Sequence, residues 1–331
     1  MPAPVLYRIG PGERRDSVEV EPVWSPSPSP SPGEGAGPLA GGYRHLFALD
    51  LADDDPHLVA IDEAGAVQVF AVTGEAPWFT PVDSAISLTG QAAAGPFGPV
   101  WDVVRPLPIG DRPHLVCYAA KRGQFAFFPL TPDLRSERPY PFRRPREPGP
   151  TAGFDTVAPI VVGSMGGFPH VMCYDVETGR VVIYSVQVTA TGFEGAAPLS
   201  ARAVWVHQWA ANWVRFAFFR LGSGTYFLKT NVGKLNVNID HVFDDPAQGA
   251  TEVAGYLDLK DALDLDVVVP VRSAAGDPGF VTYMAANGAT TFNRFRGDAS
   301  GWTTEASLTT VAGATHVVPL EVGHERFVLI C

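Results

Sequence analysis

One phrase recurs along the chain and constrains the fold more than any other feature. The letters PHLVCY at residues 113–118 return as PHVMCY at residues 169–174. In both copies an apolar run ends just before the phrase, a turn glycine lies five residues after the tyrosine (Gly123 or Gly179), and a third apolar run follows. Because no helical periodicity separates these runs, each copy predicts successive antiparallel strands joined by tight turns.

Weaker copies of the pattern cover the rest of the chain, at residues 43–72, 213–239, 265–288 and 315–331. The equivalent positions are Ala48, Pro106, Pro159, Phe218, Pro270 and Pro319. They recur at intervals of roughly 50 residues, which is typical of four-stranded propeller blades rather than of shorter solenoid repeats. The sequence therefore predicts an all-β fold, a six-bladed β-propeller. A β-sandwich with an additional N-terminal hairpin is the alternative.

Proline occupies the first strand in four of the six units, at positions 106, 159, 270 and 319. Proline cannot donate a hydrogen bond to a sheet, so a strand that carries it belongs at an edge. The innermost strand of a propeller blade is such an edge and lines the axial channel. We therefore expect the proline-bearing strands to stand side by side around a common axis.

The sixth unit supplies only two strands, within residues 315–331, and residues 4–21 read as two strands with no earlier partner. We expect residues 1–24 to complete the last blade, because a ring closed in this way hides strand edges that would otherwise pair with other molecules. Residues 25–42, rich in proline, serine and glycine, predict a disordered linker. Residues 43–331 then form the blades, with an arginine- and proline-rich loop at residues 131–153.

Composition excludes several classes of protein. Hydrophobic residues make up 46% of the 331 residues and charged residues only 18%, which suits a large core and not a disordered chain. The net charge of −11 disfavours nucleic acid and anionic membranes as partners. No apolar run is long enough to span a bilayer, and no secretory signal is visible, so we expect a cytoplasmic protein. The oligomeric state stays open.

Carboxylates recur where the first strands begin, four residues before the repeated proline. They are Asp102, Asp155 and Asp266, whereas the other three units have Arg44, Val214 and Thr315. Side chains at these positions converge on one mouth of a channel. Carboxylates that share a pocket can differ in pKa and act as acid and base. The alternative is that each aspartate caps a turn through the backbone.

The fourth unit departs most from the repeat. Tryptophan and arginine begin it, and a lysine and asparagines follow along strands that are apolar elsewhere. An apolar, aromatic cavity with a few polar groups is the usual profile of a small-molecule site. We predict as catalytic Asp102, Asp155, Arg215 and His316, and as substrate-binding His45, Trp101, Arg105, Trp209, Trp213, Lys229 and Asp266. Packing in the core is the alternative for each tryptophan.

No metal or cofactor is expected. Three histidines repeat after a proline, at positions 57, 114 and 170, but one histidine per blade leaves them too far apart to share an ion, so turn or surface roles are favoured. No phosphate-binding glycine loop, zinc motif or nucleophile motif is present.

The layout of the repeat resembles two groups of six-bladed propellers. One is lectin-like and binds sugars between blades. The other belongs to natural-product pathways and includes fungal hetero-Diels–Alderases that join a tropolone-derived quinone methide to a sesquiterpene alkene. The resemblance lies in the layout alone, so it assigns no catalytic residue.

A multivalent lectin would repeat its binding residues, whereas here the polar and aromatic positions differ between units. The asymmetry favours one axial pocket and a cofactor-independent enzyme that steers a cyclisation or cycloaddition of an apolar polyketide or terpenoid. A carbohydrate-binding lectin is the alternative, and a protein-interaction scaffold is a third.

Overall fold

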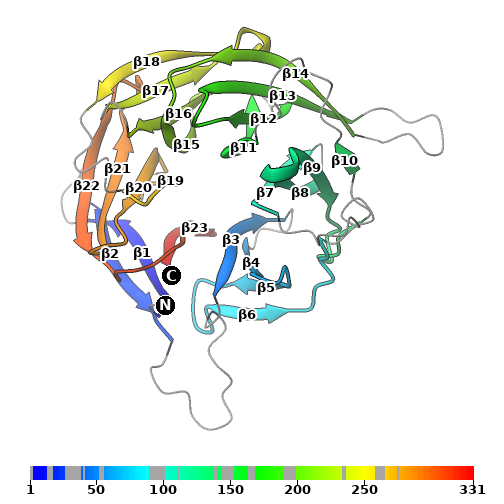
Figure 1. The fold of residues 1–331 in the computed structure, drawn as a ribbon. Coiled ribbons are helices and arrows are strands. Elements are labelled where there is room, and N and C mark those ends of the chain that lie inside the picture. The colour runs from blue at the N-terminus through cyan, green and yellow to red at the C-terminus, as the bar shows by residue number, and fades with distance from the viewer. Residues whose placement is uncertain are drawn as a thin grey trace.

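Six four-stranded antiparallel sheets form a closed ring in the computed structural model (Figure 1). The structure describes residues 3–12, 18–26, 39, 42–51, 56–88, 101–109, 112–137, 140–142, 153–162, 168–188, 199–232, 236–257, 265–273 and 276–331. The predicted six-bladed propeller is confirmed, and the sandwich alternative is wrong. Most of the predicted linker and of the arginine-rich loop lies outside the described residues.

Each blade runs from an inner to an outer strand. Blade 1 comprises β3 (Tyr43–Asp50), β4 (Pro56–Asp62), β5 (Val67–Val72) and β6 (Phe79–Val82). Blade 2 comprises β7 (Val103–Ile109), β8 (Arg112–Ala119), β9 (Gln124–Pro129) and β10 (Tyr140–Phe142). Blade 3 comprises β11 (Thr156–Val162), β12 (Phe168–Tyr174), β13 (Arg180–Val188) and β14 (Leu199–Gln208).

The second half of the ring has the same plan. Blade 4 comprises β15 (Trp213–Leu221), β16 (Gly224–Asn231), β17 (Asn236–Val242) and β18 (Ala250–Leu257). Blade 5 comprises β19 (Val267–Arg272), β20 (Pro278–Tyr283), β21 (Ala289–Phe295) and β22 (Trp302–Thr309). Blade 6 comprises β23 (Val317–Val322), β24 (Glu325–Ile330), β1 (Val5–Pro11) and β2 (Val18–Trp24).

The four repeated prolines lie on β7, β11, β19 and β23, each at the inner edge of its sheet. The inner strands of successive blades contact one another around the axis. The predicted side-by-side arrangement of the proline-bearing strands is therefore confirmed, because an edge position is where proline is tolerated.

The N-terminal strands close the ring, as predicted. β1 pairs with β24 in the register Leu6↔Leu329 and Arg8↔Phe327, and β2 pairs with the other edge of β1. The two ends of the chain consequently lie close together (Figure 1). The described parts of the chain contain no helix long and apolar enough to span a membrane.

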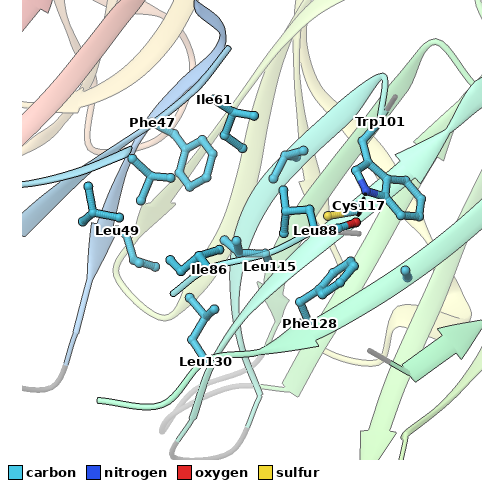
Figure 2. Packing of buried hydrophobic residues seen from close by; sticks show 14 of the residues in the cluster. Phe47, Leu49, Ile61, Ile86, Leu88, Trp101, Leu115, Cys117, Phe128 and Leu130 are labelled. Carbon is cyan, nitrogen blue, oxygen red and sulfur yellow. Dashed lines mark hydrogen bonds between the residues drawn. The ribbon is translucent and has the colours of Figure 1, made fainter. Parts of the chain in front are cut away.

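The hydrophobic core lies between the blades rather than within one layer. On β8, Leu115 and Cys117 pack toward blade 1, whereas Val116 and Tyr118 pack toward blade 3. Figure 2 shows the contact between blades 1 and 2, where Leu115 meets residues of the neighbouring sheet. Because both faces of each sheet are covered, the inner strands are apolar almost continuously.

The tyrosine of the repeated phrase forms a hydrogen bond to the next blade. Its hydroxyl oxygen accepts a hydrogen bond from a backbone N–H at or just before the start of the inner strand of the following blade. The pairs are Phe154 N to Tyr118 (2.6 Å), Trp213 N to Tyr174 (3.2 Å) and Ala314 N to Tyr283 (2.8 Å). The repeat of this tyrosine is thereby explained by a contact between blades, which the sequence had indicated only as a strand residue.

Candidate functional site: the axial channel

Two histidines mark the mouth at which the inner strands begin. His45 on β3 places Nε2 2.9 Å from the carbonyl oxygen of Trp101, and His316, just before β23, places Nε2 3.3 Å from that of Arg44. A carbonyl can only accept, so Nε2 carries the proton in both rings. The Nδ1 atom of His316 lies 2.8 Å from the Thr315 hydroxyl, which donates to it. The carbonyl bonds therefore select the Nε2–H tautomer of each neutral imidazole.

Burial lowers the pKa of His45 and, likewise, of His316. The Arg105 guanidinium lowers the pKa of both further, and the carbonyl bonds partly oppose these effects. Arg105 itself is exposed to solvent, yet enough protein surrounds it that desolvation lowers its own pKa. Blades 6, 1 and 2 thus bring His316, His45 and Arg105 into one electrostatic group.

Each of the three recurring aspartates binds the backbone of its own blade. The carboxylate accepts a hydrogen bond from the backbone N–H two residues after the repeated tyrosine of the second strand. These bonds are Ala120 N to Asp102 (2.8 Å), Val176 N to Asp155 (2.8 Å) and Ala285 N to Asp266 (2.5 Å). The geometry is that of the turn-capping alternative. Asp102 also forms an ion pair with Arg44 at 3.1 Å.

Arg215 lies at a bulge in β15, between Val214 and Ala217, with a φ of 54°. A positive φ is uncommon for a residue with a side chain, and a bulge re-aims the side chain it carries. Burial lowers the pKa of Arg215, and the charge of Asp266 in blade 5 raises it. The charge of Asp266 thus acts on Arg215 across the junction of blades 4 and 5, whereas Arg44 and Asp102 form a direct ion pair between blades 1 and 2.

Trp101 belongs to the core between blades 1 and 2 (Figure 2). Its side chain is 5% exposed, its indole N–H donates to the carbonyl of Leu88 at 3.0 Å, and its ring meets Phe128 edge to face. The structure therefore places Trp101 in the core and not with the mouth residues.

Three other predicted binding residues, Trp209, Trp213 and Lys229, form a separate cluster at the contact between blades 3 and 4. The Lys229 amino group lies 4.0 Å from the ring of Trp209 and 4.6 Å from that of Trp213. Lys229 is 4% exposed and is paired with Asp240 at 2.6 Å. The structure does not bring this cluster together with the histidines of the mouth.

A cavity of about 660 Å³ occupies the opposite half of the axis. Its apolar wall includes Ala48, Phe218, Pro270, Pro319 and Leu320, which lie at or next to the middle of the inner strands. Charged side chains line it toward the second mouth: Asp50, Arg220, Arg272, Glu321 and Arg326. The volume and the mixed lining suit a small molecule.

None of the predicted site residues lines this cavity. The predicted residues lie mainly near the beginnings of the inner strands, whereas the cavity lies toward their ends. The available signal was a charged residue at or near the end of an otherwise apolar strand, as in Asp50, Arg272 and Glu321. Glu321 lies between two arginines, 3.7 Å from Arg272 Nε and 3.9 Å from Arg326 Nε.

Two of the three repeated histidines are buried, which corrects the turn or surface role expected for them. His114 is 5% and His170 3% exposed, and Nδ1 of His114 lies 3.0 Å from the carbonyl of Arg112. In the part of the chain that the structure describes, no group of three or more histidine, cysteine or acidic side chains is arranged to hold a metal ion.

Comparison with known proteins identifies the fold and no family. No family model and no curated protein matches the chain. The chain is similar to a candidate 6-phosphogluconolactonase from Bacteroides fragilis NCTC 9343, at 12% identity over 95% of this chain and 84% of that one, with a TM-score of 0.52.

Two further solved structures resemble the chain to the same degree. A triple arginine-to-alanine variant of AofleA from Arthrobotrys oligospora, a lectin-type propeller, matches at 10% identity over 90% of this chain and 81% of that one, with a TM-score of 0.51. The periplasmic gluconolactonase PpgL of Pseudomonas aeruginosa matches at 11% identity over 98% and 99%, with a TM-score of 0.50. The expected fold-level resemblance to lectin-like propellers is confirmed, and these identities carry the fold alone.

Proposed function

We propose that the protein is an enzyme that binds one apolar small molecule on the propeller axis and steers its cyclisation or cycloaddition. The axial cavity of about 660 Å³ carries this proposal, because its size and its apolar wall suit a polyketide or terpenoid skeleton. Walls contributed by different blades hold a guest in one conformation, and restricting conformation is the main requirement of a cycloaddition.

The polar groups of the channel supply hydrogen bonds to the reacting molecule. Arg220 and Arg272, whose side chains line the cavity, carry N–H donors and positive charge. A donor bonded to a carbonyl oxygen withdraws electrons from a conjugated system and stabilises negative charge that develops on that oxygen. In this proposal Arg220 and Arg272 assist the reaction. Arg215 and His316 lie outside the cavity, Asp102 pairs with Arg44, and Asp155 binds the turn at Val176.

The binding experiment uses native mass spectrometry with a panel of conjugated polyketides, terpenoid alkenes and monosaccharides. We expect one apolar molecule per chain. Ala48→Phe, which fills the cavity, should abolish this binding, whereas Ala247→Phe on the exposed turn after β17 should leave it unchanged. Equal binding by both variants would contradict an axial site.

Once a substrate is found, the assisting residues are tested by turnover. We expect Arg220→Gln and Arg272→Gln each to lower kcat by a factor on the order of 10² while the substrate still binds, as is usual when one donor to a developing oxyanion is removed. Unchanged kcat in both variants would remove these residues from the mechanism.

A carbohydrate-binding lectin is the second candidate, and the aromatic surface of blade 3 favours it. On the outer strand β14, Trp205 stacks against the exposed ring of His207 with centroids 5.2 Å apart. A flat aromatic surface with a polar edge suits contact with a sugar ring. Binding of glycans on an array, lost in Trp205→Ala and retained in Ala48→Phe, would support the lectin over the axial enzyme.

A further inference from the structure

Lys229 on β16 and Asp240 on β17 form a buried charge pair inside blade 4. Lys229 Nζ lies 2.6 Å from Asp240 Oδ2, and the two side chains are 5% and 4% exposed. Lys229 stands opposite Asn238 in the sheet, so Asp240 is its diagonal neighbour on the adjacent strand. At the position equivalent to Lys229, blades 2 and 3 have the fully buried Cys117 and Cys173. Blade 4 therefore holds a buried amine where blades 2 and 3 have a buried cysteine.

Aromatic rings shield the amino group from water. Trp209, Trp213 and Phe227 place their ring centres 4.0, 4.6 and 5.6 Å from Lys229 Nζ. The second carboxyl oxygen of Asp240, Oδ1, is buried and has no hydrogen-bond partner among the described residues. A buried ion pair with an unsatisfied carboxylate oxygen is energetically expensive, so the site favours neutral species.

The pKa shifts of Lys229 and Asp240 also favour the neutral forms of both side chains. Burial lowers the pKa of the Lys229 amine, against the attraction of Asp240, and burial raises the pKa of the Asp240 carboxyl, against the attraction of Lys229. Both shifts favour transfer of the shared proton along the 2.6 Å hydrogen bond. In the neutral form of the pair, the amine is nucleophilic and the carboxylic acid is more electrophilic than a carboxylate.

We propose that Lys229 and Asp240 condense to form an intramolecular amide that cross-links β16 to β17. The lone pair of Lys229 Nζ forms a bond with Asp240 Cγ, and the bond between Cγ and the acid hydroxyl breaks. The hydroxyl takes one proton from the amine and leaves as water, so no oxidant, activating group or other reactant is required. The fold holds the two groups in contact, which gives a high effective concentration, and the aromatic enclosure limits hydrolysis of the product.

The cross-link also removes the cost of the buried charges, because an amide is neutral. Around it, the Asn238 amide donates to Glu252 on β18 and accepts from the backbone N–H of Tyr256. This network fixes β17 against the outer strand while the amide fixes it against β16. The inference is independent of the axial site, because no residue of the cluster lines the axial cavity.

The test is the intact mass of the full chain measured after denaturation. We expect a mass lower than that of the sequence by one water molecule, and a branched peptide joining the Lys229 and Asp240 segments after proteolysis. A full sequence mass, with both residues recovered in separate linear peptides, would show an ordinary ion pair and overturn the proposal. This measurement needs no variant and does not depend on activity.

Two variants verify which atoms are joined. Lys229→Arg keeps the positive charge without an amine able to form the bond, so its mass should equal that of its sequence; a missing water in this variant would place the cross-link elsewhere. Asp240→Asn should lose ammonia instead of water and reach the same final mass as the cross-linked wild-type chain. Thermal unfolding of each variant confirms that it is folded before the mass is compared.

Discussion

One hydrogen bond fixes the tautomer of each histidine at the mouth where the inner strands begin. His45 and His316 donate to backbone carbonyls of Trp101 and Arg44, the blades that follow them in the ring, while burial and Arg105 oppose a second proton. The neutral form is consequently part of the blade contact, since protonation would put a cation beside a guanidinium.

The two lowered histidine pKa values predict that the folded protein loses stability in acid. Folding lowers both histidine pKa values below the ordinary value of about 6.5, so the unfolded chain binds these protons more readily. The stabilisation is complete above that ordinary value and declines as the pH falls through it toward the lowered pKa values. We expect His45→Gln/His316→Gln to flatten the fall of Tm between about pH 7 and 5. Identical slopes for variant and wild type would contradict this assignment.

The aspartates at the strand entrances have two roles that substitution can separate. Asp155→Asn keeps an oxygen that accepts from Val176 N and removes the charge. We expect it to preserve stability, whereas Asp155→Ala should lower the free energy of unfolding by about 0.5–2 kcal/mol, as for loss of a cap. Urea unfolding measures this difference. A loss of turnover in Asp155→Asn at unchanged stability would instead assign the carboxylate to catalysis.

The sequence could name polar residues of the channel but not their partners. The capping role of Asp102 was visible only as an alternative, because nothing local distinguishes a carboxylate that binds a turn from one that faces a ligand. The position of Trp101 in the repeat predicts that it lines the ligand pocket. Its indole N–H instead donates to the carbonyl of Leu88, a residue outside the repeated pattern that the sequence did not indicate as a partner.

At the scale of strands and turns, the repeat predicted the features that depend on local sequence. Gly123 and Gly179 adopt the positive φ that these turns need, and the repeated prolines lie on inner edges. What escaped prediction depends on tertiary contact. The bulge that re-aims Arg215 and the cavity at the far ends of the inner strands arise from how neighbouring blades meet, which periodicity does not encode.

The tyrosine contacts between blades make a measurable contribution to stability. Tyr174→Phe removes the acceptor for the buried N–H of Trp213 and the donor to the carbonyl of Ala210. We expect the free energy of unfolding to fall by about 1–3 kcal/mol, the cost of leaving a buried polar group unsatisfied. Denaturant unfolding checks it, with Tyr226→Phe in β16 as the control that should change stability little. Equal effects of the two substitutions would mean that the hydroxyl contact is not stabilising.

For the molecule as a whole, stability depends on the pairing of β1 with β24, since this pairing alone joins the sheet of blade 6 across the two ends of the chain. Leu6 lies at that seam, fully buried and packed with Leu329 and residues of blade 1. An open ring would leave the edge of β24 unpaired, and unpaired edges associate.

Leu6→Asp tests the seam. A carboxylate at this position has no partner, so we expect a loss of several kcal/mol and release of β1 from the sheet. Light scattering after gel filtration should then detect concentration-dependent association through the free edge of β24. Glu19→Asp, at an exposed position of β2, is the matched control and should stay like the wild type. A monomeric Leu6→Asp protein of normal stability would contradict the role given to the seam.

The same seam sets the order in which the ring can form during synthesis. Strand β1 precedes five complete sheets in the chain and β24 follows them, so β1 can pair with β2 at once but with β24 only after those sheets have been made. Closure of the ring is therefore later than the folding of the blades between these strands. Such long-range pairing is slow, and the open edge of β1 is exposed to chaperones during that interval.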